Sequence, residues 1–120
     1  MSVLTYLLPD YTFKPIRWLH GEIKTPPMST AARREMGMLL RELQEGEMPA
    51  MPHSRPMSCI GIHCHELRVN DENKTWRLIY RIDPDAIVIL EVFEKKTRQT
   101  PRAMIENCRR RIKFYEASKP

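Results

Sequence analysis

Three strand-like segments follow one another in quick succession through the second half of the chain. They span about 63–70, 74–82 and 86–94, and they are rich in the β-branched and aromatic residues that favour strands. The sequence N-D-E-N joins the first pair and D-P-D joins the second, and both suit turns. The sequence therefore predicts an antiparallel β-meander, and the rest of the fold must pack around it.

A helix is predicted before the meander. Ser29 or Thr30 can cap its start, and Gly46 ends it after about Glu45. Its apolar residues recur at helical spacing on one face: Ala32, Met36, Leu39, Leu40 and Leu43.

The remaining N-terminal half is predicted to hold one further strand. Residues 13–20, F-K-P-I-R-W-L-H, read as a first strand that Pro15 would keep at a sheet edge. Residues 46–58 contain three prolines and are predicted to be a long connection without an element.

The chain is predicted to end in a helix capped by Thr100, with Pro101 at its first position. Its apolar stripe comprises Met104, Ile105, Cys108, Ile112 and Tyr115. We thus expect a single α/β (α+β) domain over residues 1–120. No apolar run reaches membrane-spanning length, and the N-terminus would make a poor signal peptide. The three cysteines have no spacing typical of disulfides, so we expect a cytoplasmic protein with reduced thiols.

Positive charge is concentrated in the last 26 residues. Residues 95–120 hold nine Lys and Arg against two Glu, a net of +7, whereas the other 94 residues hold eleven basic and thirteen acidic side chains. Such a segment suits a polyanion, most commonly nucleic acid, although it can also be a solvated helix face. We favour nucleic acid or an acidic partner.

The hydrophobic alternation sets the register of the first hairpin of the meander. If the hairpin pairs symmetrically about its turn, Arg68 faces Arg77, with Arg81 nearby on the same face. Apolar pairs then occupy the opposite face: Leu67 with Leu78, and Val69 with Trp76. Because Arg77 would point off the apolar face, we expect its removal to leave the fold intact.

Two opposed guanidinium groups cost a few tenths to about 1 kcal/mol unless an anion bridges them. Glu66 is one candidate anion and would make a self-neutralised network. A phosphate is the other, and we favour it because Lys95 and Lys96 add two cations near the same end of the sheet.

A zinc site is a weaker alternative. His63, Cys64 and His65 lie close together in the sequence, with Cys59 and His53 nearby. Adjacent strand residues point to opposite faces, and no C-x-x-C or H-x₃-H spacing occurs. We therefore predict no metal and no cofactor.

The order of the motifs resembles the RelE/ParE toxin superfamily. C-H-E-L-R-V, W-R-L-I-Y-R and I-V-I-L-E-V-F-E-K-K-T-R-Q-T-P precede a basic helix, and the likeness covers residues 14–117. It is greatest to the phage-derived, HigB-like branch of type II toxin–antitoxin pairs. The resemblance implies a small RelE-like domain with a curved antiparallel sheet, and a HigA-like helix-turn-helix antitoxin as its partner. It also implies a metal-independent endonuclease that cuts mRNA on the ribosome, by attack of the 2′-hydroxyl on the adjacent phosphate.

The resemblance assigns roles to individual residues. Arg77 and Arg68 would stabilise charge on the phosphate, and Lys95 and Lys96 would share charge stabilisation and proton transfer. Further cations would hold RNA or the ribosome: Arg81, Arg98, Arg102, Arg109, Arg110, Arg111 and Lys113.

The chain departs from the family pattern at the proton-transfer residues. Some relatives carry a tyrosine in the C-terminal segment, but none occurs in that segment here before Tyr115. Others use histidines, and His63 and His65 lie in the neighbourhood without an assigned alignment to them. The general acid and base therefore stay unassigned. A ParE-like gyrase inhibitor without enzymatic activity and an inactive basic nucleic-acid-binding module remain alternatives.

Overall fold

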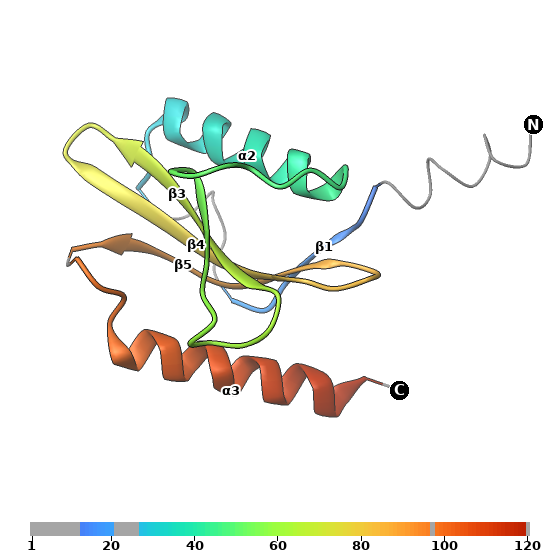
Figure 1. The fold of residues 1–120 in the computed structure, drawn as a ribbon. Coiled ribbons are helices and arrows are strands. Elements are labelled where there is room, and N and C mark those ends of the chain that lie inside the picture. The colour runs from blue at the N-terminus through green and yellow to red at the C-terminus, as the bar shows by residue number, and fades with distance from the viewer. Residues whose placement is uncertain (1–12, 21–26, 97, 120) are drawn as a thin grey trace, which may run out of the picture.

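The described residues form a five-stranded sheet with one helix on each face (Figure 1). The computed structural model describes residues 13–20, 27–96 and 98–119. Its elements are β1 (Ile16–Trp18), α2 (Thr30–Gln44), β2 (Ser54–Pro56), β3 (Cys64–Asp71), β4 (Lys74–Ile82), β5 (Ile87–Lys95) and α3 (Arg102–Ser118). The strand order is β1-β5-β4-β3-β2, and β3, β4 and β5 form the predicted antiparallel meander. The predicted α+β class is confirmed.

Short strands form both edges of the sheet. The predicted N-terminal edge strand is confirmed in shortened form as β1, which runs parallel to β5 with Ile16 opposite Ile87. The prediction that residues 46–58 hold no element is wrong, because β2 lies there and pairs antiparallel with β3. Pro56 is tolerated in β2 because an edge strand needs hydrogen bonds on one side only.

The register of the β3–β4 hairpin is as predicted. Arg68 lies opposite Arg77, and the apolar pairs Leu67–Leu78 and Val69–Trp76 occupy the other face. Each face therefore has its own core. The core under α2 joins the five predicted helix residues to strand residues that include Leu67, Val69, Trp76, Leu78, Tyr80, Ile87 and Ile89.

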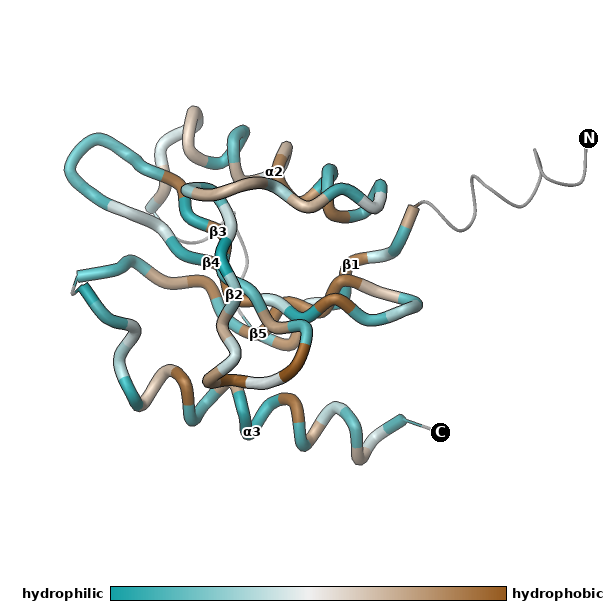
Figure 2. The backbone as a smooth tube through the Cα atoms, in the orientation of Figure 1, coloured by the Kyte–Doolittle hydropathy of each residue, from teal (hydrophilic) through white to brown (hydrophobic). Residues whose placement is uncertain are grey.

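The core under α3 is smaller. Of α3, Cys108 is fully buried, and the other residues of the predicted stripe pack against the core while partly exposed. Hydrophobic and hydrophilic positions alternate along α3 in Figure 2, as expected for a helix with one buried side. The predicted apolar faces of both helices are thus confirmed. No helix in the described ranges is long and apolar enough to cross a membrane.

The two helices begin differently. Ser29 caps α2 as predicted, since its hydroxyl accepts a 3.1 Å hydrogen bond from the Ala32 amide, and Gly46 follows the helix with a φ of 91°. The predicted Thr100 cap of α3 is wrong. Pro101 takes the N-cap position, and its carbonyl accepts from Met104 and Ile105, while Thr100 contacts a strand instead.

One carboxylate connects the β3–β4 turn to the start of α2. Asp71 Oδ2 accepts hydrogen bonds from the Ser29 amide at 2.8 Å and from the Trp76 indole at 3.0 Å. The hydrogen bond from the Ser29 backbone, which favours the ionised form, is the main reason that the pKa of Asp71 is lowered.

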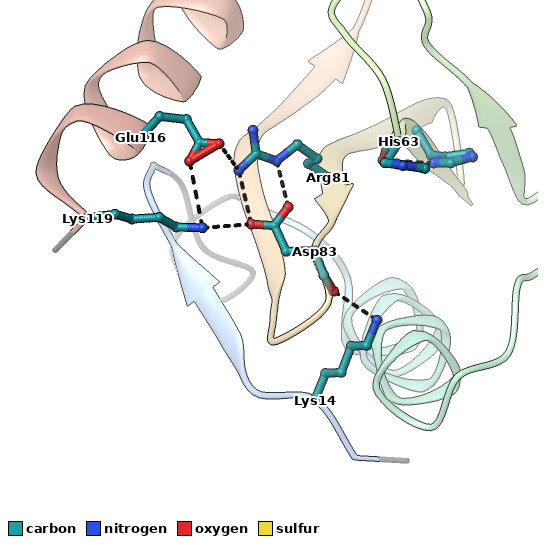
Figure 3. A network of polar contacts seen from close by, with 7 residues as sticks. Lys14, His63, Arg81, Asp83, Glu116 and Lys119 are labelled. Carbon is teal, nitrogen blue, oxygen red and sulfur yellow. Dashed lines mark hydrogen bonds and ion pairs between the residues drawn. The ribbon is translucent and has the colours of Figure 1, made fainter. Parts of the chain in front are cut away.

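A polar network joins the C-terminal end of α3 to the β4–β5 turn (Figure 3). Arg81 donates to both carboxylate oxygens of Asp83, at 2.7 and 3.0 Å, and lies 3.3 Å from Glu116. Lys119 lies 3.5 Å from Asp83, and Lys14 donates to the Asp83 carbonyl at 2.8 Å. We call these five residues the Asp83 network.

Candidate functional site: a basic cluster on the α3 side of the sheet

A basic cluster lies on the α3 side of the sheet, at the end nearest the β3–β4 turn. Paired residues on neighbouring strands share a face, so Arg68 and Arg77 lie side by side. Lys95 pairs with Thr75, two residues from Arg77, and shares that face. With strands about 4.8 Å apart and two residues spanning about 7 Å, the backbones of the three cations lie within roughly 12 Å.

Arg77 is buried and paired with Glu66. Its side chain has 0% exposed surface and that of Glu66 has 1%, and Arg77 Nη1 donates to Glu66 Oε1. The same oxygen accepts from Arg55 Nε at 3.1 Å, and Thr100 Oγ1 donates to Glu66 Oε2 at 3.4 Å. Glu66 therefore ties β2, β4 and the segment before α3 to β3.

The burial of Arg77 corrects one expectation from the sequence. The side chain does leave the apolar α2 face, but α3 and its preceding segment cover the other face as well. Its removal would leave a buried Glu66 carboxylate with one partner fewer. Pointing away from the apolar α2 face therefore does not make Arg77 dispensable for the fold, as the sequence had suggested.

Two of the three guanidinium nitrogens of Arg77 lack a hydrogen-bond partner in the part of the chain that the structure describes. Nε and Nη2 are buried and make no hydrogen bond to any described residue. Burial lowers the pKa of Arg77, Glu66 acts in the opposite direction, and Arg68 and Arg55 lower it further. Unpaired buried donors cost free energy, and an oxyanion accepting from them would recover it.

The cluster carries more positive charge than its one carboxylate neutralises. Arg55, Arg68, Arg77 and Lys95 stand against Glu66. Arg68 is half-buried and has no ion pair within the described residues. Glu66 therefore neutralises Arg77, as one interpretation of the sequence expected, whereas Arg68 and Lys95 have no carboxylate partner within the described residues. A phosphate bound at these cations stays a prediction.

Sequence reasoning missed Arg55. It lies in β2, opposite Glu66, within a segment that its prolines marked as a connection. Three residues give too short a pattern for strand periodicity to be read. The one signal in the sequence was Glu66, a charged strand residue that needs a cation such as Arg55 as its partner.

Lys96 directly follows Lys95 at the end of β5 and is exposed. Other predicted residues lie away from the cluster, and Arg81 belongs to the Asp83 network at the other end of β4. His65 lies on the α2 face, stacked on Tyr80 with ring centroids 5.6 Å apart. His63 lies directly before β3, at the end of that strand opposite the cluster. Tyr115 contacts Arg81 and Lys119 of the Asp83 network. Neither histidine nor Tyr115 is therefore placed to act beside Arg68.

The cations of the α3 region fall into two groups. Arg111 donates to the Leu90 carbonyl at 2.8 Å and lies 3.2 Å from Glu91, and Arg109 donates to the Cys59 carbonyl, so both fasten α3 to the body. The second group is exposed to solvent: Arg98, Arg102, Arg110 and Lys113.

The described part of the chain contains no group of three or more His, Cys, Asp or Glu residues that could hold a metal ion. All three cysteines are free thiols. Burial raises the pKa of Cys64 to about 11 and that of Cys108 to about 12, which makes both poor nucleophiles.

The fold and the cluster together define a small α+β domain that presents excess positive charge on one sheet face. Residues 26–113, most of the chain, match the family described as Phage derived protein Gp49-like (DUF891). The chain belongs to this family, a RelE-like toxin family of toxin–antitoxin systems. A search of curated proteins found no match.

Proposed function

We propose that the protein is a HigB-like toxin of a type II toxin–antitoxin pair and acts as a ribosome-dependent mRNA endonuclease. The observation that carries this proposal is the excess charge of the basic cluster. Arg68 has no ion pair within the described residues and lies beside two nitrogens of Arg77 that have no hydrogen-bond partner there. Membership of a RelE-like toxin family supports it.

The proposed reaction is an internal transfer of the phosphodiester. The 2′-hydroxyl oxygen of one nucleotide attacks the adjacent phosphorus, and the bond from phosphorus to the 5′-oxygen of the next nucleotide breaks. The products are a 2′,3′-cyclic phosphate and a 5′-hydroxyl. One proton leaves the 2′-hydroxyl and one reaches the 5′-oxygen, so the reaction needs no outside reactant.

The cations of the cluster would stabilise the negative charge that builds on the phosphate. Arg68 and Lys95 are partly exposed and can contact its oxygens directly. Arg77 lies beneath them and contributes through its charge and its unpaired nitrogens. Glu66 is a poor candidate base because both of its oxygens already accept hydrogen bonds. We assign proton transfer to Lys95 or Lys96.

The exposed cations Arg98, Arg102 and Lys113 would bind ribosomal RNA through its phosphates. The cognate partner would be a HigA-like helix-turn-helix antitoxin.

Primer extension on a defined mRNA, with and without translating ribosomes, tests the proposal. New 5′ ends should appear only with ribosomes and should be lost with Arg68→Gln. Arg34→Gln is the matched control, since Arg34 is an exposed arginine on α2, which covers the opposite face. An intact message with folded wild-type protein would overturn the proposal.

A second candidate function is inhibition of DNA gyrase without cleavage. The absence of exposed surface on Arg77 favours it, because a binding toxin has no need of a reachable catalytic arginine. A supercoiling assay separates the two, since only this function predicts loss of supercoiling with RNA left intact.

A further inference from the structure

A hollow lies between α3 and the edge strand β1, separate from the basic cluster. Its volume is about 420 Å³, within the range of sites that bind small molecules or side chains. Its lining is mainly apolar: Trp18, Leu19, Phe114 and Tyr115, with Arg110, Arg111 and Ser118.

Two aromatic residues of this hollow are more exposed than the fold requires. Phe114 is 78% exposed and Trp18 is 40% exposed, whereas Leu19 and Tyr115 pack against the core under α3. The hollow thus has a fixed apolar base and two exposed aromatic residues. Large aromatic residues grouped on a surface are typical of binding sites.

The charges at the hollow point to an acidic partner. Arg111 is already engaged by the Leu90 carbonyl and by Glu91. Arg110 is exposed and has no acidic partner within the described ranges. A single free guanidinium beside an apolar hollow suits one carboxylate flanked by apolar side chains. Single-stranded nucleic acid would need a row of free cations along its backbone, which this hollow does not offer.

The backbone of β1 adds a second recognition element. The Leu19 amide donates to the Ile89 carbonyl, and the Ile87 amide donates to the Pro15 carbonyl, both at 2.9 Å. In a parallel pair the alternate residues point away from the partner strand, so Ile16 and Trp18 turn their backbone groups outward. No strand in the described ranges pairs with that outer side.

We propose that this hollow, together with the outer edge of β1, binds an extended acidic segment of a partner protein. The segment would pair with β1 and insert an apolar side chain between Trp18 and Phe114, and its carboxylate would bind Arg110. This inference goes beyond the proposed function and does not depend on RNA cleavage.

Selection from a random peptide display library on the immobilised, full-length protein tests the proposal. We expect enrichment of peptides that combine Asp or Glu with large apolar residues. The most enriched peptide is then labelled, and its binding is measured by fluorescence anisotropy alongside an oligouridine of similar length. No enrichment, enrichment of basic peptides, or stronger binding of the oligouridine at this hollow would overturn the proposal.

Variants locate the binding. Phe114→Ser should weaken the peptide by about tenfold or more, as expected for a central anchor, whereas Met38→Ser, an exposed methionine on α2, should not. Arg110→Glu should bind the acidic peptide more weakly than wild type does. The same variant should bind more tightly a version of the peptide in which lysine replaces each Asp and Glu. Binding that is insensitive to Phe114→Ser, or equal for both peptides in Arg110→Glu, would contradict the proposed site.

Discussion

Arg68 and Arg77 oppose each other directly across β3 and β4, yet of the two only Arg77 has a carboxylate partner within the described structure. The pairing places two positive charges side by side, and Glu66 neutralises that of the buried Arg77. The charge of the half-buried Arg68 is not neutralised by any described carboxylate and lies near the surface. This asymmetry separates a residue that holds the fold from one that can contact a phosphate.

Arg68→Gln should therefore reduce ribosome-dependent cleavage by about 100-fold, the effect of losing one donor to a developing oxyanion. Stability should change by less than about 1 kcal/mol, because Arg68 has no ion pair with any described residue and the change relieves like-charge repulsion. Cleavage rates per folded molecule, with urea unfolding in parallel, provide the check. Arg34→Gln should behave as wild type in both measurements, and an unaltered rate for Arg68→Gln would remove Arg68 from the mechanism.

Glu66→Gln should destabilise the protein by about 3 kcal/mol, because it leaves the buried Arg77 guanidinium without a counter-charge. Arg77→Met should also destabilise, whereas the double variant with Glu66→Leu should recover much of the loss. Urea unfolding of the single and double variants measures the coupling between the two residues.

Arg55→Gln is the matched control for that pair, because the Arg55 side chain is 39% exposed although it contacts the same carboxylate. Its loss should cost about 1 kcal/mol or less. Equal effects of Arg55→Gln and Arg77→Met would argue against a special role for the buried pair.

Asp71 should make stability sensitive to acid. Its pKa is lowered in the folded protein, so its contribution is present above the unfolded pKa of about 3.9 and is lost as pH falls through the folded pKa. Asp71→Asn should lower the urea midpoint near neutral pH, and the difference from wild type should shrink below about pH 4. A difference that stays constant across that range would show that the ionised form is not what stabilises the turn.

Arg81 should act on stability and leave cleavage unchanged. Its guanidinium is held by both oxygens of Asp83 and by Glu116, and its side chain is only 12% exposed. A double-mutant cycle between Arg81→Gln and Asp83→Asn should give a coupling of about 1–3 kcal/mol, as for a bidentate, charge-assisted pair. A large drop in cleavage by folded Arg81→Gln would instead indicate that Arg81 binds RNA.

The sequence predicted the meander, its register and both apolar helix faces, because these follow from strong local periodicity. The Arg68–Arg77 pairing follows from the same pattern, since a shift of one residue would place both guanidinium groups against the apolar core. The sequence did not predict β2, because three residues form no readable pattern and because Pro56 within it and Pro52 two residues before it suggested a loop.

The burial of Arg77 and the pairing of Arg81 could not be read from the sequence. Both depend on where α3 lies across the sheet, which alternation along a single strand does not determine. The predicted Thr100 cap was wrong for a related reason. The Thr100 hydroxyl donates a hydrogen bond to Glu66, which is distant in sequence, and does not cap α3.

Cleavage of an mRNA with a single 2′-deoxy nucleotide at the mapped cut site tests the central claim most directly. If the basic cluster serves attack by the 2′-hydroxyl, the translating ribosome should position this message normally, and cleavage at that nucleotide should disappear while neighbouring sites are still cut. Continued cleavage at the deoxy nucleotide would mean that another nucleophile attacks the phosphate, and it would contradict the account given for Arg68 and Arg77.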